Sequence, residues 1–439
     1  MAAPTPTVIL GAGIIGCSIA YYLSEHQDPS SIHIVEPANE LFSSASGYAG
    51  GFLARDWHGP ATAQLAALSF EEHRRLAEEH CGRDRWGYSA TVAIGYAASA
   101  EGAGKKRGDD WLRDGTSRAD AAPTESTGAA QGGKTDDDAM IPGWLRRREG
   151  DQVDFISASD DGRPTTAQVD PALLCAFLLQ ECVDRGVTVH QPARVVEFGK
   201  DAEGNLATVS IVAEGGGAAT TRKPPSMLAI PHTPILVTPC TRLIVAAGAW
   251  SGRAFGDLFP DSGTEIPVGS LAGHSVVFKS PRWHRELEEK GCHTVFTTAD
   301  EFAPEIFARL GGGIYFAGLN SDAIPLPDLP GTVWPDPEAI QLLMRTAGEL
   351  MGSEEDMDDL EVVQEGLCFR PVTPRGVPIV SRVSDDLLGA GLTTKSGADG
   401  GVYLATGHGP WGISLSLGTG KVLAEMAQGR AVSADVSAL

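Results

Sequence analysis

Three glycines near the N-terminus have the spacing of a dinucleotide-binding turn. Gly11, Gly13 and Gly16 follow a short apolar run and open a stretch whose apolar residues have the period of a helix. Glu36 lies about 20 residues further on, at the end of a second strand-like run. The first glycine permits a tight turn, the second lets the backbone approach a pyrophosphate, and the third lets helix and strand pack closely. The pattern predicts a phosphate at a helix N-terminus; the alternative is a glycine-rich turn of an unrelated α/β fold.

The residues beyond this turn narrow the choice of nucleotide. Glu36 would accept hydrogen bonds from an adenosine ribose and would repel a 2′-phosphate, which argues against NADP. FAD and NAD share the motif, so these residues leave both open. The glycines at 311–313 precede a strand-like run instead of a helix. The chain therefore shows no second dinucleotide motif, which argues against flavoenzymes that also bind NAD(P)H.

Composition limits the partners. The 439 residues are enough for two domains or one large one. There are 34 basic and 57 acidic residues, a net charge of −23, which disfavours nucleic acid and anionic membrane surfaces. No apolar run is long enough for membrane insertion, and no signal peptide is visible. Seven scattered cysteines without a CxxC pair indicate a reducing compartment, the cytoplasm, and no metal site. The oligomeric state is not indicated.

The spacing of the apolar residues predicts alternating strands and helices. A strand at 7–10, a helix at 14–23 and a strand at 32–35 form a β-α-β unit. Further helices are expected at 61–80, 171–185, 336–351 and at the end of 403–429, and further strands at 88–96, 187–189, 243–247, 266–279 and 292–318. Residues 98–140 contain few large apolar side chains, so burial cannot offset the entropy of ordering them. They are expected to form a disordered surface insertion.

Six segments, in order, resemble the superfamily of FAD-dependent D-amino acid oxidases, glycine oxidases and sarcosine oxidases. They are VILGAGIIGCSIAYYL with Glu36-Pro37, SSASGYAGG at 43–51, AQVDP at 167–171, LIVAAGAWS at 243–251, CFRPVTPRGVPIV at 368–380 and ATGHGPWGISLSLGTGKVLA at 405–424. The residues of these segments are most similar to those of a fungal branch of oxidoreductases. The resemblance implies FAD as cofactor, bound between the N-terminal nucleotide fold and the turn that opens the last long helix.

The resemblance also implies the architecture. The fold would be α/β, with a Rossmann-like FAD-binding domain and a second, sheet-rich substrate domain of the D-amino acid oxidase type. The FAD-binding domain would comprise residues 1–84, 151–255 and 363–439, and the substrate domain residues 85–97 and 256–362.

The cofactor contacts implied by the resemblance come from four of these segments and from the strand that contains Val195. They are Gly11, Gly13, Ile14, Ile15, Gly16, Glu36, Pro37, Ser44, Ser46, Gly50, Gly51, Val195, Ala247, Gly248, Trp250, Gly407, His408, Gly409, Gly412 and Ile413. Ser44 and Ser46 could bind phosphate or ring oxygens, unless their segment is only a flexible loop. In the family the last helix points its N-terminus at the pyrimidine edge of the flavin, where it stabilises the negative charge of the reduced ring. His408 could add a proton donor or a positive charge there, or be a structural residue.

Three further residues carry the substrate-side predictions. The resemblance implies that Arg370 binds a substrate carboxylate through two parallel hydrogen bonds; the alternative is a pairing with a structural carboxylate. Tyr315 would shape the substrate pocket or belong to the sheet core. Cys368 is near the position where some relatives attach flavin covalently, but non-covalent FAD is expected, with Cys368 as a buried structural residue.

The resemblance implies an enzyme that oxidises a carbon–nitrogen bond of an amino acid or secondary amine by hydride transfer to flavin N5. Dioxygen would reoxidise the flavin, although the strand at 313–319 lacks the lysine that sarcosine oxidases use for this step. Three alternatives stay open: a flavin dehydrogenase that passes electrons to another carrier, a nicotinamide-dependent dehydrogenase, and a flavin-bearing interaction or trafficking protein with little turnover. The partner would be a small amine or amino acid, with no nucleic acid and no membrane insertion.

Overall fold

The glycine-rich β-α-β unit is built as the apolar pattern predicts. Strand β1 (Thr7–Leu10) leads into helix α1 (Ile14–Leu23), and β2 (Ile32–Val35) pairs parallel with β1. The computed structural model describes residues 5–97, 141–146, 152–156, 159–160, 163–214, 235–298, 302–353, 359–389 and 391–439. The predicted insertion at 98–140 lies outside the described residues.

A six-stranded sheet surrounds this unit, in the order β19-β20-β13-β1-β2-β9. Its other strands are β9 (Thr188–His190), β13 (Arg242–Val245), β19 (Ile379–Val383) and β20 (Gly401–Thr406). All neighbours are parallel except β19 and β20. Parallel strands buried on both faces explain why these runs read as continuous apolar segments in the sequence.

Helices α1, α5 (Pro171–Arg185) and α9 (Gly412–Ala427) pack together beside this sheet. Helix α5 begins as its sequence signals: Asp170 caps it by accepting a hydrogen bond from the Leu173 amide, Pro171 starts the first turn, and Gly186 ends the helix with a φ of 109°. Helices α1 and α9 approach closely because Gly420 has no side chain, and a Cβ there would lie 2.6 Å from Ser18.

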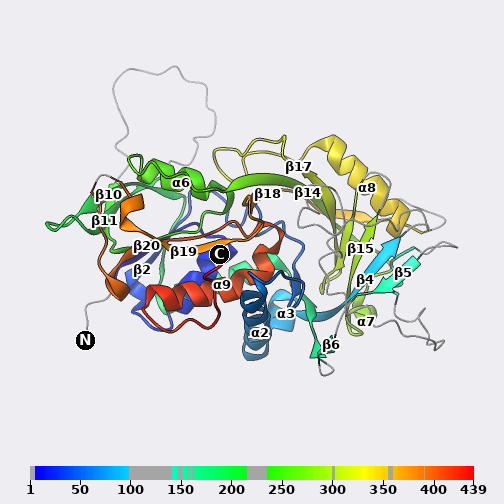
Figure 1. Cartoon of the computed structure of the whole chain (residues 1–439). Coiled ribbons are helices and arrows are strands. Elements are labelled where there is room, and N and C mark those ends of the chain that lie inside the picture. The colour runs from blue at the N-terminus through cyan, green and yellow to red at the C-terminus, as the bar shows by residue number, and fades with distance from the viewer. Residues whose placement is uncertain are drawn as a thin grey trace, which may run out of the picture.

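A nine-stranded, mostly antiparallel sheet forms the second lobe (Figure 1). The strand order is β18-β14-β17-β16-β15-β4-β8-β3, with β5 paired to β4. The bounds are β3 (Phe52–Ala54), β4 (Ser89–Ala97), β5 (Gln152–Phe155), β8 (Thr166–Gln168), β14 (Gly269–Lys279), β15 (Cys292–Thr298), β16 (Glu305–Ala308), β17 (Gly313–Ser321) and β18 (Glu361–Val372). Helix α8 (Pro337–Met351) covers one face, where Ile314 and Phe316 pack against Leu343.

Smaller elements complete the described chain. They are α2 (Ala63–Glu79), α3 (Gly82–Trp86), α6 (Ser251–Leu258), α7 (Arg285–Glu288), a three-stranded sheet of β10 (Ala193–Lys200), β11 (Leu206–Ala213) and β12 (Ile235–Pro239), and the hairpin of β6 (Ser159–Asp160) and β7 (Arg163–Pro164). Among the described helices, none combines the length and the apolar character needed to cross a membrane.

The nine-stranded sheet contains strands β3 and β8 and most of β18, all of which were expected in the FAD-binding domain. Strand β18 pairs with β14 over its whole length, so a domain boundary at residue 363 would cut through it. Strands β3 and β8 join the same sheet through β4. The domain boundaries stay a prediction. Each ladder partner lies far away in the sequence, and short apolar runs do not reveal which sheet they join.

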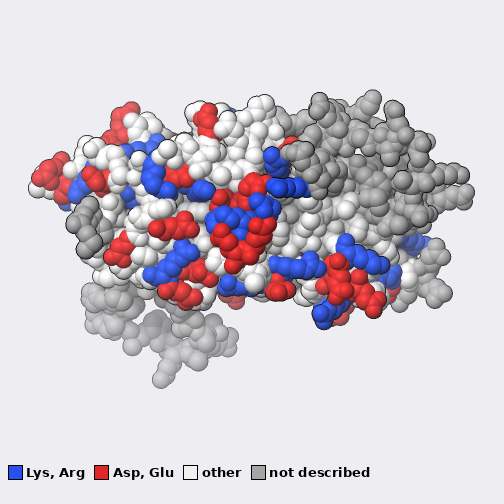
Figure 2. Space-filling model, turned by 90° about the horizontal axis from the view of Figure 1, so that it is seen from below, with Lys and Arg blue, Asp and Glu red and all other residues white. Residues whose placement is uncertain are grey.

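Charged side chains of both signs are interspersed on the face shown in Figure 2, and the coloured residues of that face form no continuous basic patch. On helix α2, Arg74 pairs with Glu71 and Glu78, and Arg75 pairs with Glu72 and Glu79. The basic side chains of this helix are therefore neutralised locally by acidic neighbours.

Candidate functional site

A cavity of about 790 Å³ lies where loops of the six-stranded sheet meet the nine-stranded sheet. All but two of the cofactor contacts expected from the sequence line it, together with Arg370, Tyr315 and Cys368. The two exceptions are glycines with packing roles. A Cβ on Gly16 would lie 2.0 Å from the Gly11 carbonyl oxygen, and one on Gly407 would lie 2.4 Å from Thr373. The structure thus gathers residues from both ends of the chain around one space.

The β1–α1 turn forms one end of the cavity. Gly11 has a φ of 104°, and a Cβ there would meet the Ala246 carbonyl oxygen at 2.6 Å, so only glycine suits this position. The amides of Gly13 and Ile15 have no hydrogen-bond acceptor within the described residues. Both residues line the cavity at the N-terminus of α1. Such amides are suited to phosphate oxygens.

Glu36 is held in place by the backbone on both sides of it. Its two carboxylate oxygens accept hydrogen bonds from the amides of Ala12 and Ala38, each at 2.9 Å. Burial raises the pKa of Glu36 above its ordinary value, although these two hydrogen bonds oppose the shift. The side chain lines the cavity, where its remaining lone pairs could accept hydrogen bonds from a ribose.

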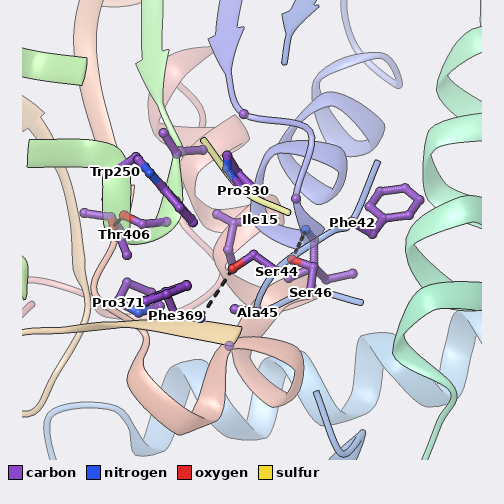
Figure 3. A pocket seen from close by; sticks show the side chains of 18 of the residues that line it. Ile15, Phe42, Ser44, Ala45, Ser46, Trp250, Pro330, Phe369, Pro371 and Thr406 are labelled. Carbon is purple, nitrogen blue, oxygen red and sulfur yellow. Dashed lines mark hydrogen bonds between the residues drawn. The ribbon is translucent and has the colours of Figure 1, made fainter. Parts of the chain in front are cut away.

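The segment at 43–51 is tied to both neighbouring elements by its serines. Ser46 Oγ accepts a hydrogen bond from the Ile14 amide at 3.0 Å, and Ser44 Oγ accepts one from the Phe369 amide at 3.3 Å (Figure 3). Both serine oxygens thus bind backbone amides of α1 and β18. Their hydroxyl protons remain available to an acceptor in the cavity.

A buried arginine holds the end of the same segment. Arg309 donates to the Ala49 carbonyl through Nη2 at 2.5 Å and to the Gly50 carbonyl through Nε at 3.2 Å. Gln168 Nε2 also donates to the Gly50 carbonyl, at 2.6 Å. Asp170 lies 3.8 Å from the guanidinium and partly balances its charge. The carbonyls of this segment are engaged by Arg309 and Gln168, which fixes the backbone beside the cavity.

His408 lines the cavity between β20 and α9 as a neutral side chain. Burial lowers its pKa to about 3, so the ring carries no charge near neutral pH. Its Nε2 lies 3.0 Å from the Thr419 hydroxyl oxygen. The role of His408 beside the flavin stays a prediction. Its buried Nδ1 has no hydrogen-bond partner within the described part of the chain.

A second buried histidine, His73 on α2, supports the start of α9. Its Nε2 donates to the Ile413 carbonyl at 3.0 Å, and its Nδ1 is buried with no partner among the described residues. Burial lowers the pKa of His73 to about 4. The first turn of α9 lines the cavity, so His73 helps to position that turn from behind.

The pKa of His73 leads to a stability prediction. The unfolded chain binds this proton below pH 6.5 and the folded chain only below about pH 4, so stability falls as the pH falls through this interval. The free energy of unfolding should drop by about 1.4 kcal/mol per pH unit from this group. Urea unfolding at about pH 7.5 and about pH 5 should therefore show a loss about 2 kcal/mol smaller in His73→Gln than in the wild type. The exposed His26, changed to Gln, is the control; equal losses in wild type and His73→Gln would contradict the assignment.

The nine-stranded sheet forms the opposite wall of the cavity. Arg370 crosses β14 above Gly273 and donates from Nη1 to Asn320 Oδ1 at 2.7 Å. It forms no ion pair with a carboxylate of the described residues, so the alternative of a structural ion pair finds no support there. Tyr315 is 3% exposed, and burial raises its pKa to about 12, so its hydroxyl keeps the proton. Cys368 is buried on the same strand as Arg370, two residues before it.

These features fit an FAD molecule. The unpaired amides of Gly13 and Ile15 lie at one end of the cavity, and the unpaired Nδ1 of His408 lies at the other. Gly412 and Ile413, the first residues of α9, also line the cavity. A dinucleotide with a polar ring system could form hydrogen bonds with these groups.

Several cavity residues escaped the sequence interpretation. Three of them line the cavity: Glu305, Phe307 and Thr406. Two more contact residues that line the cavity: Arg309 binds the Ala49 carbonyl, and Asn320 binds Arg370. Glu305 and Arg309 carried a usable signal, because charged residues in an apolar strand need partners or a function. Asn320 and Thr406 carried none, since their positions depend on long-range strand pairing.

Comparisons with known proteins bear on the family and the fold. The family model described as FAD dependent oxidoreductase matches residues 7–426. C1F5.03c of Schizosaccharomyces pombe, an oxidoreductase by name, is 26% identical over 447 residues, with 98% of this chain and 96% of that protein covered. A D-amino acid dehydrogenase of Cereibacter sphaeroides is 27% identical over 189 residues, 43% of this chain and 36% of that protein. Glycine oxidase from Geobacillus kaustophilus superposes with a TM-score of 0.66 at 20% identity, covering 98% of this chain and 96% of that chain. The predicted α/β fold is confirmed.

Proposed function

The chain belongs to the family of FAD-dependent oxidoreductases, and from this premise we propose that it oxidises a carbon–nitrogen bond of an amino acid or secondary amine. The observation that carries the proposal is the guanidinium of Arg370, which lines the cavity without a carboxylate partner among the described residues. A substrate carboxylate would complete it. The proposed electron acceptor is dioxygen.

The residues of the cavity divide between cofactor and substrate. The α1 N-terminus and Glu36 would hold the adenosine and pyrophosphate part of FAD, and the start of α9 with His408 would face the ring. When bound, FAD would supply the two-electron acceptor for the hydride that leaves the carbon next to nitrogen. We propose that FAD binds non-covalently.

The chain's own contribution is positioning and water exclusion. Arg370 would orient the substrate through its carboxylate, because a guanidinium fork binds carboxylate oxygens in a fixed plane. The aromatic rings of Tyr315 and Phe307, which stack with centroids 5.7 Å apart, would keep water from the reacting carbon. Since the Tyr315 hydroxyl keeps its proton, it can donate a hydrogen bond to the same carboxylate.

The deciding experiment is anaerobic reduction of the purified protein with its FAD by a panel of amino acids and amines. Bleaching of the flavin absorption band by at least one α-amino acid or secondary amine is expected. A protein that contains no flavin and takes none up, or a flavin that none of the panel reduces, would overturn the proposal. Admitting air afterwards and measuring peroxide tests the choice of dioxygen as acceptor.

A flavin dehydrogenase is the second candidate. The favouring observation is that no lysine is found among the described residues that line the cavity. The relative in Cereibacter sphaeroides is also a dehydrogenase by name. Rapid anaerobic reduction followed by slow reoxidation in air, with fast reoxidation by an artificial electron carrier, would favour this candidate. The alternative of an interaction protein rests on residues 98–140, which lie outside the described residues.

Cys368 yields a prediction on the mode of flavin attachment. The thiol is buried, 3% exposed, and lines the cavity. We expect acid precipitation of the yellow protein to release all colour into the supernatant, since the proposal is non-covalent FAD. Cys368→Ser should behave in the same way. Yellow colour retained in the wild-type pellet and lost from the Cys368→Ser pellet would show a covalent link instead.

A further inference from the structure

Strand β17 contains a β-bulge near the cavity. On the neighbouring strand β14, a single residue separates Gly273 from Ser275. Their partners on β17 are Asn320 and Ala317, which are separated by two residues. The first of these two, Gly318, has a φ of 144°, a conformation that favours glycine. A bulge of this kind bends its strand and changes the face to which the following side chains point.

The bulge turns Asn320 toward the cavity side of the sheet. Side chains alternate between the two faces of a strand, and Phe316 packs in the core beneath α8. Without the extra residue, Asn320 would point to that core as well. After the bulge, Leu319 packs against this core instead. Asn320 pairs with Gly273, and Gly273 pairs with Cys368, which lines the cavity. Directly paired residues share a face, so Asn320 lies on the cavity side.

From this position Asn320 binds the guanidinium of Arg370. A Cβ on Gly273 would lie 1.8 Å from Nη1 and 2.8 Å from Nη2, so the guanidinium lies directly over the backbone of β14. On the far side of β14, Asn320 Oδ1 accepts a hydrogen bond from Nη1 at 2.7 Å. An amide oxygen accepts this hydrogen bond without a negative charge, and the guanidinium has further N–H groups for a carboxylate. The partner of Arg370 on β17 is thus uncharged.

We propose that Asn320 is a positioning residue that makes the site selective for carboxylates: its uncharged oxygen orients the guanidinium of Arg370 and leaves the positive charge to the substrate. This rests on the proposed function. An aspartate in place of Asn320 would bind the guanidinium more tightly, but it would also neutralise its charge and repel a second carboxylate. The amide at this place therefore separates a cation that is open to a ligand from an ion pair that is closed within the protein.

The test compares Asn320→Asp with Asn320→Ala, because a merely structural role and the proposed role rank these variants in opposite order. If Asn320 only anchored Arg370, aspartate would replace it better than alanine. If Asn320 keeps the charge of Arg370 available to a ligand, aspartate is the worse replacement. The first ligand is α-aminoisobutyrate, which has no hydrogen on its α-carbon and cannot be oxidised there. The second is α-aminoisobutyramide, in which an uncharged amide replaces the carboxylate.

Binding to the FAD-loaded protein is measured by the perturbation of the flavin spectrum. The wild type should bind α-aminoisobutyrate at least about tenfold more tightly than α-aminoisobutyramide. Asn320→Asp should weaken the binding of α-aminoisobutyrate at least about thirtyfold and so remove the preference. Asn320→Ala should weaken it only about two- to fivefold, the effect of one lost hydrogen bond. Neither variant should weaken the binding of α-aminoisobutyramide.

Gln364→Glu is the matched control, because it makes the same change from amide to carboxylate at an exposed position of β18. It should leave both dissociation constants unchanged. The inference is overturned if Asn320→Asp binds α-aminoisobutyrate at least as tightly as Asn320→Ala does, or if it loses both ligands equally. Unchanged α-aminoisobutyrate binding in Asn320→Ala also overturns it, which covers the case of an Asn320→Asp protein that does not take up FAD. These measurements involve no flavin reduction, so the anaerobic panel judges the proposed function separately.

Discussion

Replacing Arg370 with alanine should weaken substrate binding by about 2–5 kcal/mol, which is a rise in the dissociation constant of roughly thirtyfold to several thousandfold. The reason is that the guanidinium that binds the carboxylate is lost together with both of its hydrogen bonds. The measurement is the substrate concentration dependence of anaerobic flavin reduction. Arg370→Lys should recover only part of the loss, because an ammonium group cannot form the planar fork.

Arg345→Ala is the control for this change. Arg345 is exposed on α8, a helix that covers the other face of the sheet, so its removal alters the net charge equally without touching the cavity. Flavin content and the urea midpoint show whether each variant folds and binds FAD. Saturation behaviour in Arg370→Ala equal to that of the wild type would remove Arg370 from the substrate site.

Gly273→Ala should weaken substrate binding by roughly ten- to a hundredfold, although Gly273 itself would not contact substrate. A Cβ at this position would lie 1.8 Å from Arg370 Nη1 and 2.7 Å from its Cζ. The guanidinium would have to leave its place above β14 and give up Asn320. Because the clash is with the end of a flexible side chain, we expect the fold and FAD binding to survive.

A double-mutant cycle separates this explanation from a general disturbance of the sheet. If Gly273→Ala acts by displacing Arg370, it should have almost no effect in an Arg370→Ala background, so the two losses should not add. Gly269→Ala on the same strand is the control, since a Cβ there would be 3.8 Å from its nearest neighbour, an ordinary contact. Additive losses in the double variant would contradict the displacement.

Short sequence patterns predicted much of the part of the chain that would bind the nucleotide. The spacing of Gly11, Gly13 and Gly16 predicted a turn that the structure contains, with the φ of 104° at Gly11 that only glycine adopts easily. The cap of α5 could be recognised from Pro171 and Gly186. Each of these features depends on residues that are neighbours along the chain, and so a pattern of a few residues is enough to predict them.

The cavity wall formed by the nine-stranded sheet was predictable only in part. Arg370, Tyr315 and Cys368 were expected near the cofactor from the resemblance, and the structure places all three at the cavity; their roles stay predictions. Glu305 was not expected there. It reaches the wall because β16 pairs with β17, and β17 with β14, and no local pattern specifies such pairings.

The sequence by itself determined the nucleotide turn, the helix boundaries and the family, because each depends on residue types at fixed short spacings along the chain. Only the tertiary structure decided the burial of His408, the partner of Arg370 and the place of Glu305 on the cavity wall. The physical reason is the same for all three: burial and strand pairing bring together residues that are distant in sequence, and the free energy of a charge depends on those neighbours rather than on the residues next to it in the chain.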